Sequence, residues 1–592
     1  MKEEETQNVG PKHKKGGMRT MPFIMANEAC EKLAVVGSSA NLLSYLTAQL
    51  HMPLTKAATT LTNFGGTSSL TPLLGAFIAD AFAGRFWTIT VASIIYQFGM
   101  VCLTLSATLP GLRPPPCPPT SHDCRPAAAT EGQLAMLYGS LLLTALGSGG
   151  IRPCVAAFGA EQFEETGQKQ STKMWNFFNW YYFCMGASIL VAVTLIVYIQ
   201  DNVGWGWGFG VPTALMALSV LCFVVGFPLY RHMNPAGSPL TRLAQVIVAA
   251  VRKRDVVVPE DPGLLYENDL LDAGISATGR LLHTNQFTFL DHAAVVTPSD
   301  TTDSSGAPPS KPSLWRLSTV HRIEELKSLI RMVPIWAAGI PLILAAAQQY
   351  TFSLQQARSM DRRLSSSFSI PASSMGVFTI VSMLLTVSLY DRLLIPVARR
   401  FTGLDRGISF LHRMGIGFAI SVVATFVAGF VEVKRRHRAL MGDGVESVFW
   451  LVPQYILHGV AEGFMSIGHL EFFYDQAPES MRSTATALFW TAISAGNYCS
   501  TLLVIVLHRF TNWLPDDDLN KGRLERLYWL ITGIQVLNLG YYTLCARSYT
   551  FKPLELRGEE GDEKVKGGEV EMLVSVWPLK FAGEELNESS SI

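Results

Sequence analysis

The chain has 592 residues, of which 49% are hydrophobic and only 16% are charged, whereas soluble domains carry roughly 25% charged residues. Its 47 basic residues are balanced by 47 acidic ones, and this neutral balance gives no support for a nucleic-acid partner. The apolar residues gather in long runs with the charges between them, which excludes an ordinary soluble multidomain protein. We expect a multi-pass membrane protein that works as a monomer in a lipid bilayer.

Residues 1–20 are polar and contain no cleavable signal, so the first apolar run is expected to act as its own insertion signal. Lys12, Lys14, Lys15 and Arg19 lie in this tail, and basic residues favour the cytoplasmic side of a membrane. We therefore expect a cytoplasmic N-terminal tail.

Apolar runs long enough to cross a membrane recur along the chain, since about 20 helical residues span the ~30 Å of hydrocarbon. Six runs lie in 21–230 and six in 331–550, and a long polar stretch separates them. Two six-helix halves with an even number of spans place the linker and both tails, including 551–592, in the cytoplasm. The predicted spans lie near residues 22–49, 56–81, 86–108, 133–158, 173–200, 207–230, 331–356, 371–398, 405–432, 448–474, 483–508 and 527–547.

The first span contains three ionisable residues, Glu28, Glu31 and Lys32. Positions i, i+3 and i+4 share one face of a helix, so these groups line one stripe inside the membrane. Facing lipid would cost several kcal/mol for each group, so they are expected to face water or one another. A carboxylate shielded from water gains a proton more readily, which predicts a proton-coupling site. A structural ion cluster near the membrane interface is the alternative.

Two further ionisable residues lie in opposite halves, Arg152 in the fourth predicted span and Glu471 in the tenth. An ion pair between them that breaks when Glu471 is protonated would couple proton loading to rocking of the halves. The sequence alone does not show that the two side chains touch.

The linker, 231–330, is the longest connection between predicted spans. Its flanks at 239–254 and 317–330 have amphipathic helical patterns, and 297–313 is rich in Ser, Thr, Asp and Pro. We expect two amphipathic helices with a disordered middle. One feature opposes the predicted orientation: the basic run 434–438 falls in a loop that the span count places outside the cell.

Several motifs are missing from the sequence. It has no phosphate-binding G-x-x-x-x-G-K-[ST] loop, and its 12 histidines show neither an H-E-x-x-H pattern nor paired clusters. We therefore expect no ATP-driven transport within the chain, no metal or other cofactor, and no enzymatic activity.

The chain resembles the plant nitrate/peptide transporters, which belong to the proton-coupled oligopeptide transporter group of the major facilitator superfamily. The resemblance covers roughly residues 20–550 and is closest in the subfamily linked to nitrite, gibberellin and abscisic acid. It rests on Glu28-x-x-Glu31-Lys32, on the loop motif Gly75–Arg85, on Phe178–Phe183, on Glu471–Tyr474 and on Pro478–Ser483.

The resemblance implies an all-α membrane protein with the major facilitator fold and 12 transmembrane helices. It implies proton coupling by Glu28, Glu31 and Lys32, and an inter-half salt bridge between Arg152 and Glu471. Thr88 matches a regulatory phosphorylation position of a dual-affinity nitrate transporter. The candidate substrate-binding residues are Arg152, Glu471, Ala346, Gln349, Phe489 and Trp490.

Two departures bear on the substrate. Peptide-carrying relatives follow the first-helix motif with an aromatic F-x-Y-Y pattern, but this chain reads Leu-Ala-Val-Val-Gly at 33–37. The nitrate transporter has a histidine on helix seven where this chain has Ala346. We therefore predict a symporter that imports small organic acids with protons as the coupling ion.

The expected substrates are the hormones gibberellin and abscisic acid, with nitrite as a further substrate. A nitrate or di/tripeptide symporter is one alternative, and a transport-dead nitrate or hormone receptor is another. The plasma membrane is the expected location, with the vacuolar and plastid membranes as alternatives.

Overall fold

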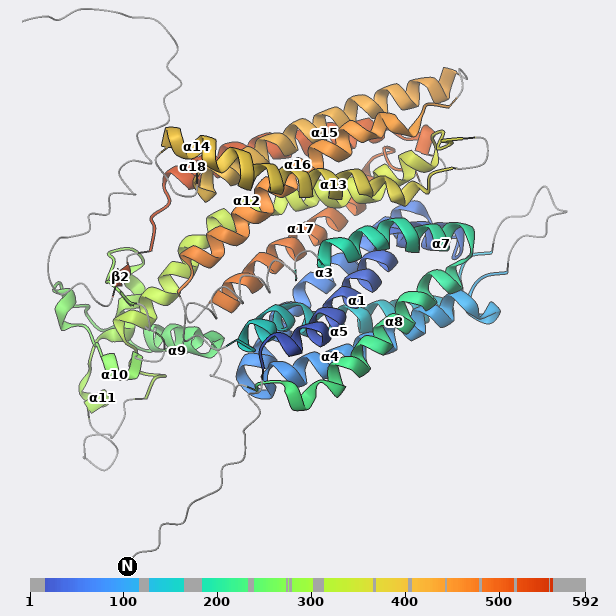
Figure 1. Ribbon diagram of the computed structural model, residues 1–592. Helices are drawn as coiled ribbons and strands as arrows, with labels where there is room; N and C mark the ends of the chain where they lie inside the picture. Colours follow the sequence, from blue (N-terminus) through green and yellow to red (C-terminus); the bar gives the residue numbers. More distant parts are fainter. Residues whose placement is uncertain are drawn as a thin grey trace, which may run out of the picture.

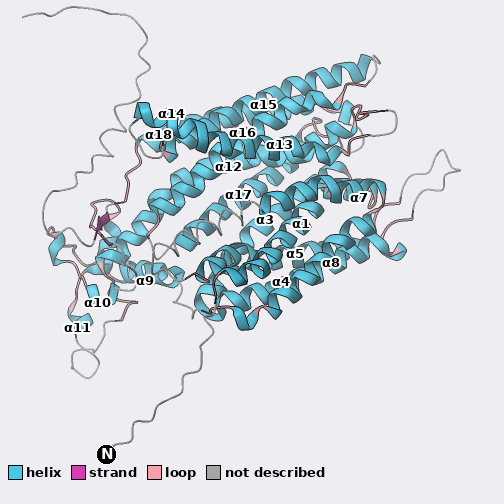
Figure 2. Ribbon diagram, viewed as in Figure 1, coloured by secondary structure: helices cyan, strands magenta, loops and turns pink. Residues whose placement is uncertain are grey.

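A computed structural model shows two helical bundles side by side, with a smaller assembly at one end (Figure 1). Apart from two three-residue strands, the regular structure of the described residues is helical (Figure 2). The structure describes residues 16–115, 127–163, 181, 184–232, 239–272, 275, 279–301, 313–365, 369–402, 407–441, 445–478, 482–515, 519–552 and 554–556.

The N-terminal bundle is built from closely packed helices with small residues at their contacts. A Cβ atom on Gly147 would lie 2.5 Å from the backbone nitrogen of Tyr96, so glycine is needed where α5 (Glu131–Glu161) crosses α4 (Gly84–Thr108). Gly84 has a φ of 72°, a conformation that glycine adopts readily, at the junction between α3 (Leu54–Ile78) and α4. The helices are α1 (Met21–Ala40), α2 (Leu42–Ala48), α3 (Leu54–Ile78), α4 (Gly84–Thr108), α5 (Glu131–Glu161), α7 (Val197–Asn202) and α8 (Trp205–Val225).

The C-terminal bundle follows the linker. Its first helix, α12 (Val320–Arg358), begins well before the predicted span at 331. The other helices are α13 (Val377–Leu389), α14 (Ile395–Thr402), α15 (Phe410–Met441), α16 (Val452–Gln476), α17 (Arg482–Phe510) and α18 (Leu524–Arg547).

Every predicted span overlaps a helix, although most of the first third of the fifth span, 173–200, lies outside the described residues. Within the described residues, eight helical stretches are long and apolar enough to cross a membrane. One of them, Leu54–Thr108, contains both α3 and α4 and so accounts for two predicted spans. The helices of the described residues are compatible with twelve spans, and the number twelve itself stays a prediction.

The two bundles meet along α3 and α17 and at the end away from the linker. Thr501 donates to Asn63 Oδ1 at 2.8 Å, joining α17 to α3. At the far end, Arg358 Nη1 donates to Thr47 Oγ1 at 3.0 Å and Ser373 donates to Asn41 Oδ1 at 2.6 Å. These contacts join the two bundles at the end that we predict to face the outside of the cell.

The sequence predicts a loop for the basic run 434–438, but the structure places this run in the last turns of α15. Arg435 is buried and pairs with Glu432 at 2.7 Å, while Arg438 Nε lies 3.1 Å from Glu446 Oε1. Arg436 Nη1 lies 3.6 Å from Glu525 Oε1. Acidic side chains from three segments therefore compensate the positive charge that opposed the predicted orientation.

The linker forms a folded assembly around the start of α12. Helix α9 (Pro239–Arg252) packs through Val246 against Leu290 and Ile323 in one buried apolar cluster. The assembly also contains α10 (Asp269–Asp272), α11 (Pro298–Thr301) and β1 (Gly279–Leu281), and β1 pairs antiparallel with β2 (Leu554–Leu556) near the end of the described chain.

Both predicted amphipathic flanks are helical. The described part of the expected disordered middle is folded, because apolar side chains such as Leu290 become buried there. Residues 302–312 lie outside the described residues.

Candidate functional site

The three ionisable residues of α1 form one buried ion cluster. Lys32 Nζ lies 2.9 Å from Glu28 Oε1 and 2.7 Å from Glu31 Oε2, so one ammonium bridges both carboxylates. Glu28 and Glu31 are 2% and 0% exposed, and α1 is regular from Met21 to Ala40. The helical spacing read from the sequence brings these groups together.

Helix α5 supplies further partners to this cluster. Glu31 Oε1 accepts a hydrogen bond from Ser148 at 3.0 Å and lies 3.4 Å from Arg152 Nε. Arg152 Nη1 donates to the Ser68 carbonyl at 3.3 Å. The ion pair that the structure records for Arg152 is therefore with Glu31, inside the N-terminal half.

Arg152 also reaches the C-terminal half. Its guanidinium carbon lies 5.3 Å from the centre of the Trp490 ring on α17, within the ~6 Å range of a cation–π contact. A chain of contacts thus runs from Glu28 through Lys32, Glu31 and Arg152 to Trp490.

This arrangement can couple a proton to a rearrangement. Glu28 Oε2 is buried and has no hydrogen-bond partner in the described structure, so a proton can bind there without displacing another group. Neutralising Glu28 or Glu31 leaves Lys32 and Arg152 competing for fewer negative charges. Since Arg152 contacts both halves, a change in its pairing can reach the interface between them.

The predicted pairing of Arg152 with Glu471 stays a prediction. The backbone of Glu471 lies in α16, but its side chain lies outside the described structure. The aromatic motif at 178–183 falls outside it as well, except for Tyr181, which is buried.

The remaining candidate substrate residues are spread along α12 and α17. Gln348 donates to Ser500 Oγ at 2.7 Å, which places the neighbouring Ala346 and Gln349 opposite the middle of α17. Trp490 lies ten residues before Ser500, or roughly 15 Å along the helix axis. These candidates therefore form an elongated series and not one compact cluster.

Two side chains in this series have distinctive surroundings. The Phe489 ring lies 5.7 Å from the His469 ring in an edge-to-face contact between α17 and α16. The Nε2 atom of Gln349 is buried without a partner in the described structure, so it can donate to a bound molecule.

Sequence reasoning missed Glu462, an acidic residue in the middle of α16. Its side chain is half-buried in the C-terminal bundle. Its position inside the predicted span 448–474 is a signal that the sequence contains, because a carboxylate within a membrane span is a functional-site candidate in its own right.

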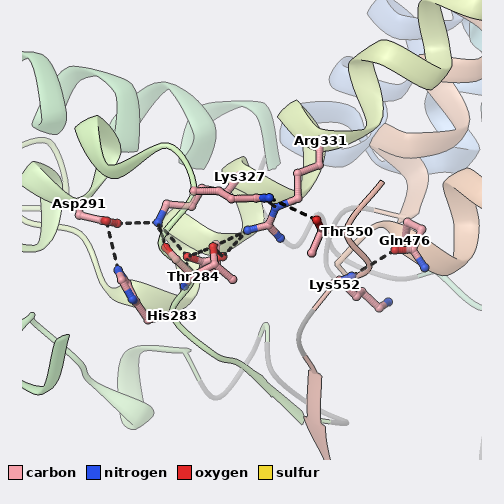
Figure 3. Close-up of polar contacts among 10 residues, drawn as sticks. His283, Thr284, Asp291, Lys327, Arg331, Gln476, Thr550 and Lys552 are labelled. Carbon is pink, nitrogen blue, oxygen red and sulfur yellow. Dashed lines mark hydrogen bonds and ion pairs between the residues drawn. The ribbon is translucent and has the colours of Figure 1, made fainter. Parts of the chain in front are cut away.

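A second group of chemically capable side chains lies in the linker assembly (Figure 3). Ligand atoms of His283, Asp291 and Glu324 lie within 4.8 Å of one another, close enough to hold a metal ion. However, Lys327 Nζ lies 2.8 Å from Asp291 Oδ1 and 2.9 Å from Glu324 Oε1. The ammonium already compensates both carboxylates, so we interpret this group as a buried ion network.

Comparison with known proteins decides the family. The model of the POT family matches residues 86–520. The chain belongs to the POT family. Protein NRT1/ PTR FAMILY 3.1 of Arabidopsis thaliana is 64% identical over 575 residues, covering 95% of each chain. Protein NRT1/ PTR FAMILY 8.3 of the same plant is 44% identical over 554 residues, covering 91% of this chain and 93% of the relative.

Solved POT structures share the fold. An auto-inhibited POT family peptide transporter is 22% identical with a TM-score of 0.67, over 92% of this chain and 99% of that chain. The POT family transporter PepTSo is 22% identical with a TM-score of 0.65, over 90% and 98% of the two chains.

These comparisons confirm the predicted family and the all-α major facilitator fold. The chain is a multi-pass, proton-coupled membrane transporter of small substrates and not an enzyme. The substrate, the membrane that houses the protein and the link to the hormone and nitrite subfamily stay predictions.

Proposed function

We propose that this POT family transporter imports small organic acids together with protons, with gibberellin and abscisic acid as its principal substrates and nitrite as a further one. The observation that carries the proposal is the contact of Arg152 with both Glu31 and Trp490. The same guanidinium contacts a buried carboxylate of the N-terminal half and an aromatic ring of the C-terminal half.

Inward transport of an anion needs coupling to protons, because the membrane potential opposes it. Moving one negative charge inward against 100 mV costs about 2.3 kcal/mol. One co-transported proton cancels that charge, and a second gives the step a net inward driving force. The two carboxylates of α1 suit such a cycle, and the half-buried Glu462 on α16 is an additional candidate for carrying a proton.

The shape and chemistry of the candidate substrate region support an acid with a bulky apolar body. Ala346 is half-buried between the buried Ala345 and Ala347, so α12 presents small side chains where the nitrate transporter has a histidine. The roughly 15 Å between Trp490 and Ser500, which is level with Gln348, suits an elongated body. Arg152 would meet the carboxylate of such a ligand.

Peptide transport is the second candidate, because one solved structure with the same fold is described as an auto-inhibited POT family peptide transporter. Its identity of 22% supports the fold alone. The aliphatic residues at 33–37 favour the acid over the peptide.

The test is a competition uptake screen in proteoliposomes at acidic and neutral outside pH, with gibberellin, abscisic acid, nitrite, nitrate and dipeptides as competitors. We expect saturable uptake of the hormones that rises as the outside pH falls. Weak acids also cross membranes unaided in their protonated form, so liposomes with the Glu31→Gln variant are the control. High-affinity uptake of nitrate or dipeptide with no uptake of either hormone would refute the substrate assignment, and no uptake of any competitor would favour a receptor.

A further inference from the structure

A cavity of about 450 Å³ lies where the linker assembly, the start of α12 and the segment after α18 meet. Gln286 from the linker, Arg331 from α12 and Thr550 from the segment after α18 line it. Figure 3 shows Arg331 and Thr550 on facing sides of this junction. The transport site described above does not include any of these residues.

Arg331, which is ion-paired with Glu324 and also donates to Thr284, brings a guanidinium with one unused donor to the cavity. The residue is 7% exposed, its Nε donates to Gln286 Oε1 at 2.6 Å, and its Nη2 donates to Glu324 Oε2 at 3.1 Å. Its Nη1 atom is buried and has no hydrogen-bond partner in the described structure. A buried guanidinium with an unused donor is costly, so an anionic acceptor in the cavity would stabilise it.

Thr550 presents a hydroxyl group next to this cation. The residue is exposed, and its Oγ1 accepts a hydrogen bond from Gln286 Nε2 at 3.2 Å, so one glutamine side chain separates it from Arg331. Arg547, three residues earlier, is also exposed and gives the segment a basic flank. Thr88, the other threonine considered for phosphorylation, is buried, and its hydroxyl donates to the Gly84 carbonyl at 2.9 Å. Its hydroxyl is therefore less accessible than that of Thr550.

We propose that Thr550 is a phosphorylation site and that Arg331 binds the phosphoryl group. In the modification, the Thr550 oxygen attacks the γ-phosphorus of ATP on a protein kinase. The new O–P bond forms as the bond to ADP breaks, ADP leaves, and the hydroxyl proton passes to the kinase base. The product carries two negative charges near neutral pH and three acceptor oxygens, which match the unused Nη1 donor.

The phosphoryl group would add a charged contact between segments that already meet through the β1–β2 pairing and the Gln286–Thr550 hydrogen bond. Tyr549 OH and the Lys552 backbone nitrogen both donate to Gln476 Oε1 at 3.2 Å, and Lys552 Nζ donates to the Ala477 carbonyl at 3.0 Å. The segment 549–552 therefore already holds the end of α16. Binding of phospho-Thr550 by Arg331 links that end to α12 and the linker, which makes the modification a regulatory clamp on the C-terminal half.

The test compares hydrogen exchange of the backbone at 549–552 in the full-length protein, with and without phosphothreonine at 550, in wild type and Arg331→Gln. We expect phosphorylation to slow exchange about tenfold in wild type and not in Arg331→Gln, since a charge-assisted hydrogen bond stabilises by about that factor. The unmodified Arg331→Gln protein corrects for any general loosening. If that variant does not fold, Arg331→Lys replaces it, and the slowing should fall below half of the wild-type value because lysine lacks the planar donor pair.

Arg547→Gln is the matched control, because it removes an arginine that does not line the cavity and should keep the full slowing. Equal slowing in wild type and Arg331→Gln would overturn the proposal. So would equal slowing of the unmodified protein by inorganic phosphate alone, which would assign the cavity to a free anion. Phosphopeptide mapping of the chain from plant cells should find phosphate on Thr550, and its absence would overturn Thr550 as a modification site.

Discussion

Replacing Glu31 with glutamine tests the coupling network most directly. The buried cluster contains two carboxylates, Glu28 and Glu31, and two cations, Lys32 and Arg152, so its charges balance. The Glu31→Gln change leaves the cluster with one excess positive charge. Lys32 keeps Glu28 at 2.9 Å, and the glutamine carbonyl can still accept from Ser148. We therefore expect a loss of stability below the ~3–5 kcal/mol typical of a buried pair that loses one partner.

The functional loss should be much larger than the loss of stability. Each coupled proton contributes about 1.4 kcal/mol per unit of pH gradient and about 2.3 kcal/mol per 100 mV, or roughly a 500-fold difference in accumulation under both. If Glu31 carries one of the protons, Glu31→Gln should lower the limiting accumulation by about that factor. Exchange of labelled for unlabelled substrate needs no net proton movement and should continue.

The assay measures both quantities in proteoliposomes with an imposed pH gradient and membrane potential. Glu432→Gln is the matched control, because Glu432 is equally buried and paired with Arg435, but lies away from Arg152. That variant should be less stable while the uptake that remains stays pH-driven. Gradient-driven accumulation by Glu31→Gln at the wild-type level would refute the role of Glu31.

Three further predictions concern other parts of the molecule. Trp490→Leu removes a contact that contributes about 0.5–2 kcal/mol, so the transport rate should fall roughly 2- to 30-fold, whereas Trp490→Phe should lose less; equal rates for all three proteins would contradict a cation–π role. Ala346→His should raise nitrate uptake relative to hormone uptake in the same vesicles, and an unchanged ratio would argue against Ala346 as a determinant of the substrate. Lys327→Met removes the ammonium shared by Asp291 and Glu324 and should destabilise the linker assembly by about 3–5 kcal/mol, seen as faster proteolysis within 279–301; wild-type protease resistance would contradict the buried ion network.

The sequence by itself determined the features that depend on local periodicity. Long apolar runs must become helices in a bilayer, because each backbone polar group has to be paired within its own segment. The spacing of Glu28, Glu31 and Lys32 placed them on one helix face, and the structure joins all three through the Lys32 ammonium. The family followed from motifs of the same local kind.

Only the tertiary structure decided which distant side chains meet. Arg152 lies 121 positions from Glu31, and their contact depends on how α5 packs against α1, which no local pattern encodes. The linker was misjudged for the same reason: its polar composition suggested disorder, but Val246, Leu290 and Ile323 bury one another across the chain. Thr550 and Gln286 are 264 positions apart, and the cavity that both line exists only because the segment after α18 packs against the linker.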